Sequence, residues 1–333
     1  MKDKDIAKLA GVSRSTVSRV VNDYDNVAPK TKEKIKKVIK KYGYVPHASA
    51  RALAGKSNKI IGVFVTNAIQ NNKGFRIFRN IYFSPFEAAV IDYAGEEGYN
   101  VLISIINNDS DFEKARELFY NKTISGGIFV GARNSDRKIF KLIESGYKMV
   151  IIDQEQDKAK MIGKYIVVNS DNLDGAYKAT KHLIEYGHKE IAHICGDMNK
   201  FSGFRRLEGY KKAMSEAGLP VKEGNIVKGD FTEDSGYSCV VRQLIEGNNI
   251  TGIFASNDVM AVGAMKAIKE MGLKIPDDIS IVGYDDITIA SYTSPPLATV
   301  KISISKMASI AAKSLINFIE NGINYSEYNT VSA

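Results

Sequence analysis

The stretch that decides the fold is Asp5-Ile6-Ala7-Lys8-Leu9-Ala10-Gly11-Val12-Ser13-Arg14-Ser15-Thr16-Val17-Ser18-Arg19-Val20-Val21-Asn22. Apolar residues recur at helical spacing on both sides of Gly11, which predicts two short helices. Glycine readily takes the left-handed conformation that ends a helix, so Gly11 marks the turn between them. Ser13 is expected to cap the second helix, because its hydroxyl can accept from free backbone amides. The pattern is that of a helix-turn-helix, which presents its second helix to the DNA major groove.

The second helix has an apolar face and a polar, cationic face. Val17, Val20 and Val21 are expected to face inward, which leaves the polar side chains outside. Arginine can bond guanine O6 and N7 together, whereas hydroxyl and amide groups suit phosphate oxygens. The residues predicted to contact DNA in this region are Lys2, Ser13, Arg14, Ser15, Thr16, Ser18, Arg19 and Asn22. An ordinary surface helical hairpin is the alternative, but turn, cap and charge agree on a DNA-reading unit.

The basic excess of the chain is confined to its amino-terminal part. Residues 1–59 hold 15 Lys and Arg against 5 Asp and Glu, a net charge of +10, whereas the whole chain carries +8. The remaining residues therefore carry −2. A third helix is expected to begin near Pro29, with Ile35, Val38 and Ile39 closing a small core. Several of its lysines are expected to lie on a solvated face, as in most charge runs. Others are expected to lie near the DNA backbone and add salt-dependent affinity for it.

Residues both before and after the predicted third helix match a known family. The matching residues are Asp5-Ile6-Ala7, Ala10-Gly11-Val12-Ser13, Thr16-Val17-Ser18-Arg19-Val20, Asn22, Gly43-Tyr44, Pro46, Ala50-Arg51 and Leu53. On these residues the chain resembles the lactose/galactose repressor (LacI/GalR) family of bacterial transcription regulators. The resemblance implies a hinge helix and linker at residues 46–58 that folds on operator DNA, with Ala50 in contact and Leu53 wedged into the minor groove. The alternative for this alanine-rich stretch is a flexible linker.

Three positions depart from the family pattern. The family usually has a threonine and an aliphatic residue where this chain has Lys2-Asp3, and His47 stands where asparagine is common. Asp3 is expected to cap the first helix. The operator half-site preference therefore does not follow from the resemblance.

From Lys59 onward, short apolar runs alternate with helical stretches. This alternation predicts parallel sheets covered by helices on both faces, and about 270 residues is more than one core usually holds. The resemblance implies a two-lobed α/β body like the periplasmic binding proteins, following the all-α headpiece of residues 1–45 and the hinge. The expected effector-binding and dimerisation domain is 59–333, with lobe 1 at about 59–170 and 297–333 and lobe 2 at about 171–296.

Open α/β sheets bind ligands at the carboxyl ends of their strands, where Asp153, Asn257 and Asp285 fall. The resemblance implies that an effector pocket is lined by Asp153, Arg206, Phe231, Asn257 and Asp285, with Tyr82 and Phe83 over the ligand and Thr66 as a weaker member. Packing is the alternative for Phe231, and support of the loop before Ile287 is the alternative for Asp285. The polar stretch at residues 67–81 is expected to form a lid or a disordered loop.

Other chemistry is not supported by the sequence. No phosphate-binding loop follows the first strand, no catalytic set stands out, and His182, His188 and His193 fall on different elements, so no enzyme activity, cofactor or metal is expected. Cys195 and Cys239 in apolar contexts predict reduced thiols. No signal peptide and no run of membrane-spanning length is recognised, which predicts a cytoplasmic protein that does not enter a membrane.

These features predict a DNA-binding repressor, with no enzyme activity, that acts as a homodimer on double-stranded operator DNA. A small ligand, expected to be a sugar or sugar derivative, would control its DNA affinity. Residues 307–319 are an expected contributor to the dimer because Ile310, Leu315, Ile316 and Ile319 are apolar. The alternatives are control by a partner protein or a purine, a sugar-binding transport component, and a cytosolic sugar enzyme.

Overall fold

The computed structural model describes residues 3–21, 24, 26–44, 58–66, 82–134, 136–155, 165–322 and 327–333. Four predicted DNA contacts lie outside these residues, namely Lys2, Asn22, Ala50 and Leu53, as do residues 46–57 of the hinge and the stretch 67–81. The described chain forms two compact units. One comprises residues 1–60 with 117–125, and the other residues 61–116 with 126–333.

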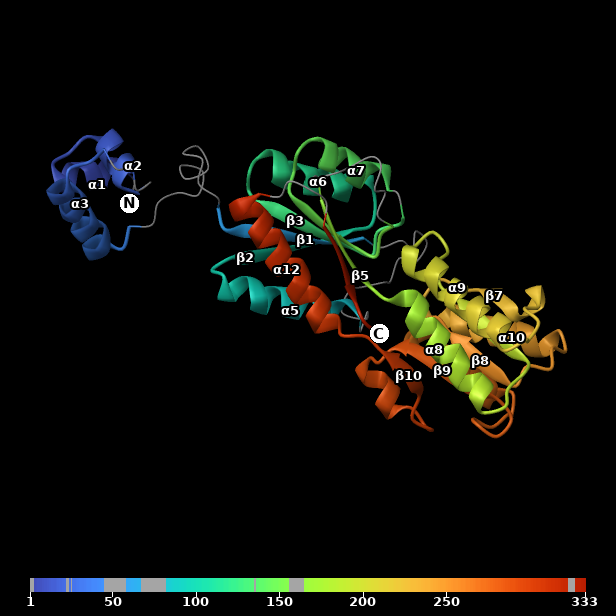
Figure 1. The fold of residues 1–333 in the computed structure, drawn as a ribbon. Coiled ribbons are helices and arrows are strands. Elements are labelled where there is room, and N and C mark those ends of the chain that lie inside the picture. The colour runs from blue at the N-terminus through green and yellow to red at the C-terminus, as the bar shows by residue number, and fades with distance from the viewer. Residues whose placement is uncertain are drawn as a thin grey trace. The chain divides into compact units, whose positions relative to one another are not determined.

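The amino-terminal unit contains a bundle of three helices (Figure 1), which are α1 (Asp3–Ala10), α2 (Arg14–Val21) and α3 (Pro29–Tyr42). Gly11 has a φ of 61° between α1 and α2, and the Ser13 hydroxyl accepts from the Thr16 amide at 3.1 Å, so the predicted turn and cap are confirmed. The fully or nearly buried side chains are Ile6, Ala7, Ala10, Val17, Val20, Val27, Ile35 and Tyr44. Leu9 is not among them, because it lies on the outer face of α1 and is half exposed.

The larger unit is built on two parallel sheets. The first has the strand order β11-β5-β4-β3-β1-β2. Its strands are β1 (Ile60–Thr66), β2 (Asn100–Ile106), β3 (Gly126–Val130), β4 (Met149–Ile152), β5 (Ile166–Ser170) and β11 (Glu327–Val331). Its helices are α5 (Phe83–Glu96), α6 (Asp109–Tyr120), α7 (Arg137–Glu144) and α12 (Ile304–Asn321). Alternate strand residues such as Ile61, Val63 and Ile128 pack against α5 and α12, which lie on one face of this sheet, while α6 and α7 lie on the other (Figure 1).

The second sheet has the strand order β10-β9-β8-β6-β7. Its strands are β6 (Ile191–Cys195), β7 (Ile226–Lys228), β8 (Gly252–Ala255), β9 (Ser280–Asp285) and β10 (Ala298–Lys301). The pair α8 (Asn172–Glu185) and α9 (Phe201–Glu216) covers one face, and the pair α10 (Glu233–Ile245) and α11 (Asp258–Glu270) covers the other. Two short 3₁₀ helices, η2 (Glu223–Asn225) and η3 (Thr288–Tyr292), complete the elements of this lobe. Strands on both sheets run parallel, as the alternation of elements predicted.

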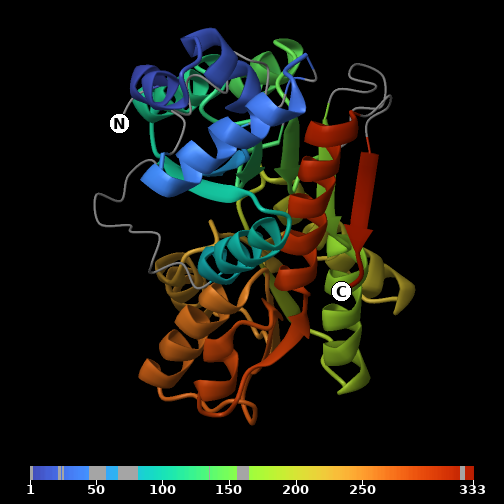
Figure 2. The same cartoon turned by 90° about the vertical axis from the view of Figure 1, so that its left-hand side faces the viewer.

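The chain leaves the first sheet after β5 and returns after β10, which is later than predicted. Leu297 was expected to begin the returning segment, but it is buried in the core of the second lobe, and Ala298–Lys301 pairs with β9. This strand was missed because it is a short, half-exposed edge strand with no apolar run. After it, α12 and then β11 rejoin the first sheet, and these two red elements lie side by side in Figure 2.

The apolar residues of α12 serve the core of their own lobe. Leu315 and Ile316 are buried against the first sheet, and Ile310 and Ile319 pack at the edge of the same cluster. Their hydrophobicity is therefore explained by packing within the chain. It gives no support to the prediction that these four side chains contribute to a dimer contact.

Helices α8 and α9 approach each other closely at a glycine. A Cβ added to Gly209 would lie 2.3 Å from the Leu173 carbonyl oxygen and 2.8 Å from the Ala176 Cβ. Both obstacles belong to the neighbouring helix and cannot move aside as a flexible side-chain end could. The close pairing of α8 with α9 therefore requires glycine at this position. Arg206 lies on α9, three residues before this glycine.

We expect Gly209→Ala to lower the free energy of unfolding by about 2–3 kcal/mol, because overpacking forces the two helices apart. Gly95→Ala is the matched control, since Gly95 lies in α5 with nothing within 4 Å of an added Cβ. The free energy of unfolding of that control should rise by up to about 1 kcal/mol from helix propensity alone. Urea unfolding followed by circular dichroism measures both variants, and equal effects would contradict the packing explanation.

Candidate functional site

The start of α2 carries a cluster of hydroxyl groups. The Ser13 Oγ lies 2.7 Å from the Ser15 Oγ and 2.8 Å from the Thr16 Oγ1, and it also accepts the Thr16 amide. Ser13 and Ser15 are exposed, and Thr16 is partly exposed. Since hydroxyl groups at the end of a recognition helix suit phosphate oxygens, this cluster fits the predicted role of holding the helix in register on DNA.

The two arginines of α2 lie on its outer side. Arg14 and Arg19 are exposed and Ser18 is partly exposed, whereas Val17 and Val20 are buried and Val21 is partly buried, as predicted. On α3, Lys37 forms an i,i+4 ion pair with Glu33 at 2.9 Å, so part of the lysine-rich face is neutralised by its own helix. The remaining exposed lysines include Lys34, Lys36 and Lys40. The contacts of these residues with DNA stay predictions.

The centre of the larger unit's candidate site is Arg206, whose side chain is only 6% exposed. Its Nε donates to the Asn172 Oδ1 at 2.9 Å, and its Nη1 donates to the Ser256 carbonyl oxygen. The guanidinium carbon lies 3.7 Å from the ring centroid of Tyr284, within the range of a cation–π contact. Three elements of the second lobe therefore position one buried cation, because a buried charge is tolerated only when it is paired and hydrogen-bonded.

Asp285 is the counterion of Arg206. Its Oδ1 faces the Arg206 Nη2 at 3.4 Å, and its side chain is as deeply buried as the arginine. Burial raises the pKa of Asp285 to about 7, although the arginine opposes this rise. For Arg206 itself, burial is the largest influence and favours the neutral form, but Asp285, Tyr284, Asp153 and Tyr82 together outweigh it, so the net effect raises the arginine pKa. Asp285 ends β9 with a φ of 113°, a conformation that non-glycine residues rarely adopt.

Asp153 approaches the same arginine from the first lobe. It follows β4 with a φ of 62°, and its Oδ2 accepts from the Ser202 Oγ at 2.6 Å. Burial raises its pKa, while the Ser202 hydroxyl, Arg206 and Lys200 oppose the rise. The Tyr82 hydroxyl belongs to the same group of charges, because burial and then Asp285 raise its pKa while Arg206 opposes the rise. The structure thus brings together four of the predicted residues.

Phe231 is the fifth member of this group, and glycine makes room for it. A Cβ on Gly196 would lie 2.0 Å from the Phe231 ring, so the ring occupies the space that any other residue would fill. The ring centroid lies 5.9 Å from the Arg206 guanidinium carbon, and Phe231 has a φ of 71°. Asn257 holds this loop, since its Nδ2 donates to the Phe231 carbonyl at 3.2 Å while its Oδ1 caps α11.

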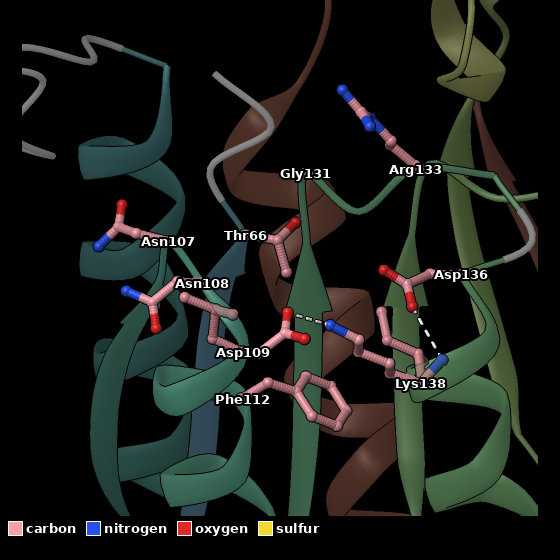
Figure 3. Close-up of a pocket in the computed structure, with 11 residues that line it drawn as sticks. Thr66, Asn107, Asn108, Asp109, Phe112, Gly131, Arg133, Asp136 and Lys138 are labelled. Atoms are coloured by element: carbon pink, nitrogen blue, oxygen red, sulfur yellow. Dashed lines mark hydrogen bonds and ion pairs between the residues drawn. The ribbon is translucent and has the colours of Figure 1, made fainter. Parts of the chain in front are cut away.

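Thr66 and Phe83 occupy other places. The Thr66 Oγ1 donates to the Val130 carbonyl at 3.2 Å, and Phe83 packs on the core of the first sheet. Thr66 lines a cavity of about 140 Å³ at the carboxyl edge of β1, β2 and β3 (Figure 3). An ion pair between Asp109 and Lys138 spans this cavity, and Arg133 lies at its rim.

The two lobes touch beside Asp153 through loops that follow β3, β4 and β6. The Asn134 amide donates to the Asn199 carbonyl at 2.7 Å, and the Arg133 Nε lies 3.7 Å from the Asp197 Oδ2. Together with the bond between Ser202 and Asp153, these contacts connect the strand ends of both sheets. A molecule bound beside Asp153 would therefore act on the contacts that hold the lobes together.

Several residues that build the site were not predicted from sequence. Asn172 and the Ser256 carbonyl hold Arg206, and Tyr284 stacks on it. Asp258 accepts the Ile287 amide at 2.9 Å and the Thr299 hydroxyl at 2.5 Å, so it supports the loop after Asp285. Asn257 was predicted from sequence and its neighbour Asp258 was not, because residue type alone does not separate a supporting residue from one that faces a ligand.

The two cysteines and His193 are buried and packed within the fold. Cys195 and Cys239 are free and buried, and burial raises the pKa of both. His193 is buried between the rings of Phe254 and Tyr210, with centroid separations of 4.7 and 5.2 Å. Burial lowers its pKa to about 3, so this histidine is neutral. Within the described chain, no three His, Cys, Asp or Glu side chains gather in a way that would hold a metal ion.

Comparison with known proteins assigns the chain to a family. A family model described as bacterial regulatory proteins, lacI family, matches residues 4–47, and one described as a periplasmic binding protein-like domain matches residues 180–331. The HTH-type transcriptional repressor PurR of Haemophilus influenzae strain PittEE is 35% identical over 318 residues, which cover 95% of this chain and 90% of that protein. The chain belongs to the LacI family. It is a DNA-binding transcriptional repressor of that family, and the fold class predicted from sequence is confirmed.

Solved structures of LacI-family regulators share the same architecture. A lac repressor dimer bound to operator and the anti-inducer ONPF matches with a TM-score of 0.77 at 28% identity, covering 98% of this chain and 96% of that one. A complex of the transcriptional regulator CelR with cellobiose matches with a TM-score of 0.76 at 27% identity, covering 100% and 97% of the two chains. Among the residues the structure describes, no helix has the length and apolar character needed to cross a membrane.

The buried acid gives the LacI-family body a predicted pH dependence. The pKa of Asp285 rises from 3.8 to about 7 on folding, so its contribution to stability is fully present below pH 3.8 and is lost as the pH rises through 7. Between pH 5 and 7, we expect the free energy of unfolding of wild type to fall by up to about 1.4 kcal/mol per pH unit relative to that of Asp285→Asn. Urea unfolding of both proteins at each pH measures the difference, and a constant difference would contradict the assignment.

Proposed function

We propose that this repressor is controlled by a small neutral polyol, such as a sugar, bound around Arg206, and that it acts as a homodimer on operator DNA in the cytoplasm. The observation that carries the ligand site is the backbone of Asp153, Phe231 and Asp285. All three are non-glycine residues with φ between 62° and 113°. Such conformations cost free energy and persist where the surroundings impose them, commonly at functional sites. Here they gather around one buried arginine.

The hydrogen-bonding needs of the site favour a ligand rich in hydroxyl groups. The buried Asp153 Oδ1 accepts no hydrogen bond from the described residues, and the Asp285 Oδ1 faces Arg206 in an ion pair at 3.4 Å that leaves it able to accept from a ligand as well. A buried acceptor left unsatisfied is costly, and a ligand that donates to both would remove that cost. Vicinal hydroxyls can donate to a carboxylate, and the apolar face of a sugar ring suits an aromatic ring such as Phe231.

The balance of charge also favours a neutral ligand. Arg206 is paired with Asp285, and Arg133 is paired with Asp197. Lys200 interacts favourably with Asp153. Each of these cations therefore already has a carboxylate near it, so an anionic ligand such as a sugar phosphate would have to displace one. Purines, the alternative weighed from sequence, are neutral as well and could stack on Phe231, so they belong in the same ligand screen.

Control of DNA binding would run through the contacts between the lobes. A ligand that donates to Asp153 competes with or reinforces the bond from Ser202, and so changes how the strand ends of the two sheets meet. The resemblance implies that hinge helices at residues 46–58 pair on DNA only when the two bodies of the dimer are suitably placed. Ligand and operator would then each favour one arrangement of the lobes.

The base-reading role of Arg19 can be separated from its charge. Using a duplex selected from a random pool by the wild-type protein, we expect Arg19→Lys to keep its affinity for unrelated DNA but to lose about tenfold or more for the selected duplex. Arg19→Ala should lose affinity for both, with the larger loss on the selected duplex. Fluorescence anisotropy measures these affinities. If Arg19→Lys bound the selected duplex as wild type does, the residue would contribute charge and no base reading.

The ligand site can be tested by thermal shift with a panel of sugars, sugar phosphates and purines. We expect a neutral sugar to raise the melting temperature of wild type, and Asp153→Asn to remove at least half of that rise because an acceptor of a charge-assisted hydrogen bond is lost. Asp109→Asn is the matched control, since it removes a carboxylate from the cavity in Figure 3 and should leave the rise intact. Loss of the rise in Asp109→Asn alone would place the ligand in that cavity. A rise given only by purines would overturn the sugar assignment.

A further inference from the structure

We propose that Asp3 is a positioning residue that sets how strictly Arg14 discriminates between bases. The inference rests on the proposed base-reading role of α2, and it concerns one of the two positions at which the headpiece departs from its family. The sequence predicted a helix cap for Asp3, but the structure gives its side chain two other partners. It forms one ion pair and accepts one hydrogen bond, and both link α1 to other parts of the headpiece.

The first partner anchors the carboxylate. Asp3 is the first residue of α1, and its Oδ1 accepts a hydrogen bond from the hydroxyl of Tyr44. The ring of Tyr44 is buried in the headpiece core just after Gly43, whose left-handed conformation ends α3. Because the buried ring is fixed by packing, its hydroxyl holds the Asp3 carboxylate in one place. The Asp3 side chain is correspondingly only 20% exposed.

The second partner is the arginine at the start of the recognition helix. The Arg14 Nε lies 4.0 Å from the Asp3 Oδ2, although the arginine side chain is 74% exposed. An exposed arginine otherwise samples many rotamers, and ordering it on DNA costs entropy. An anchored carboxylate beside Nε narrows that range. It also leaves a geometry in which the two terminal nitrogens can bond guanine O6 and N7 together.

The same carboxylate works against contacts that carry no sequence information. A negative charge beside the recognition helix repels phosphate and partly offsets the attraction of Arg14 for the DNA backbone. At an ion-pair distance of 4.0 Å on the surface, the pair is weak enough for the arginine to move onto a base. Asp3 is thus expected to lower affinity for arbitrary DNA while raising discrimination at the base that Arg14 reads.

The test uses the full-length protein and a duplex that it selects from a random pool. Affinities are measured for that duplex, for all its single-base-pair variants and for an unrelated duplex, each over a salt series. Arg14→Ala identifies the base pair whose preference depends on Arg14. Asp3→Asn then keeps an amide oxygen for Tyr44 but removes the charge, and melting curves check that the headpiece stays folded.

We expect Asp3→Asn to reduce discrimination at the Arg14 base pair roughly three- to tenfold, and to leave the other positions unchanged. Its affinity for unrelated DNA should rise, with a salt slope steeper by about one. Adding Asp3→Asn to Arg14→Ala should change no base preference further. Tyr44→Phe, which keeps the charge but removes its anchor, should reduce discrimination at the same base pair without the rise for unrelated DNA.

A purely structural role for Asp3 predicts a different pattern, in which affinity falls equally for every duplex as the headpiece loses stability. That pattern, or unchanged discrimination in Asp3→Asn where Arg14→Ala abolishes it, would overturn the inference while leaving base reading by Arg14 intact. If Arg14→Ala altered no base preference, the base-reading role of Arg14 itself would fail, and the positioning role would fail with it.

Discussion

The buried guanidinium of Arg206 is the interaction on which the arrangement of the larger unit's candidate site depends. A cation in this position must be satisfied on all sides, and the chain satisfies it with an amide oxygen from α8, a carbonyl after β8, and a ring and a carboxylate at the end of β9. These elements meet at the carboxyl edge of the second sheet. The close approach of α8 and α9 at Gly209 and the space left by Gly196 for Phe231 both serve this arrangement. Removal of one partner would leave a charge buried without compensation, which is far costlier than removal of the whole group.

The site also explains why two acids, Asp153 and Asp285, are withdrawn from water beside the same arginine. Asp153 comes from the first lobe and Asp285 from the second, and both interact with the same arginine. Both have a strained backbone conformation, and the Asp153 Oδ1 accepts no hydrogen bond from the described residues. Such features lower stability in the free protein. They are understandable where a ligand completes the hydrogen bonding, because the strained residues are then already in the binding conformation.

Much of the architecture was predictable, because it depends on patterns that are local in sequence. The turn at Gly11, the Ser13 cap and the alternation of short apolar runs with helical stretches were all recognised from neighbouring residues. The short strands β7, β10 and β11 were missed, since edge strands with few buried residues carry no apolar signal. The same limit applies to α12, whose apolar residues could not be assigned to core or interface until their neighbours in the fold were known.

The candidate site was predicted in part for a similar reason. Strand ends and the family resemblance indicated Asp153, Arg206, Phe231 and Asp285, which the structure brings together. Asn172, Ser202 and Tyr284 were missed because their roles arise from contacts between elements distant in sequence. Thr66 was included because it ends the first strand and Phe83 because of the family resemblance, yet their side chains contact the first sheet.

We expect the ligand site and the DNA-reading unit to be coupled through a shared equilibrium, and such coupling is reciprocal by thermodynamic necessity. The most direct measurement is a full cycle by isothermal titration calorimetry. It uses the sugar that gives the largest thermal shift and a duplex selected by the protein. We predict that the sugar changes operator affinity by about five- to 150-fold, and that operator changes sugar affinity by the same factor. Tight binding of both molecules with no mutual effect would contradict the claim.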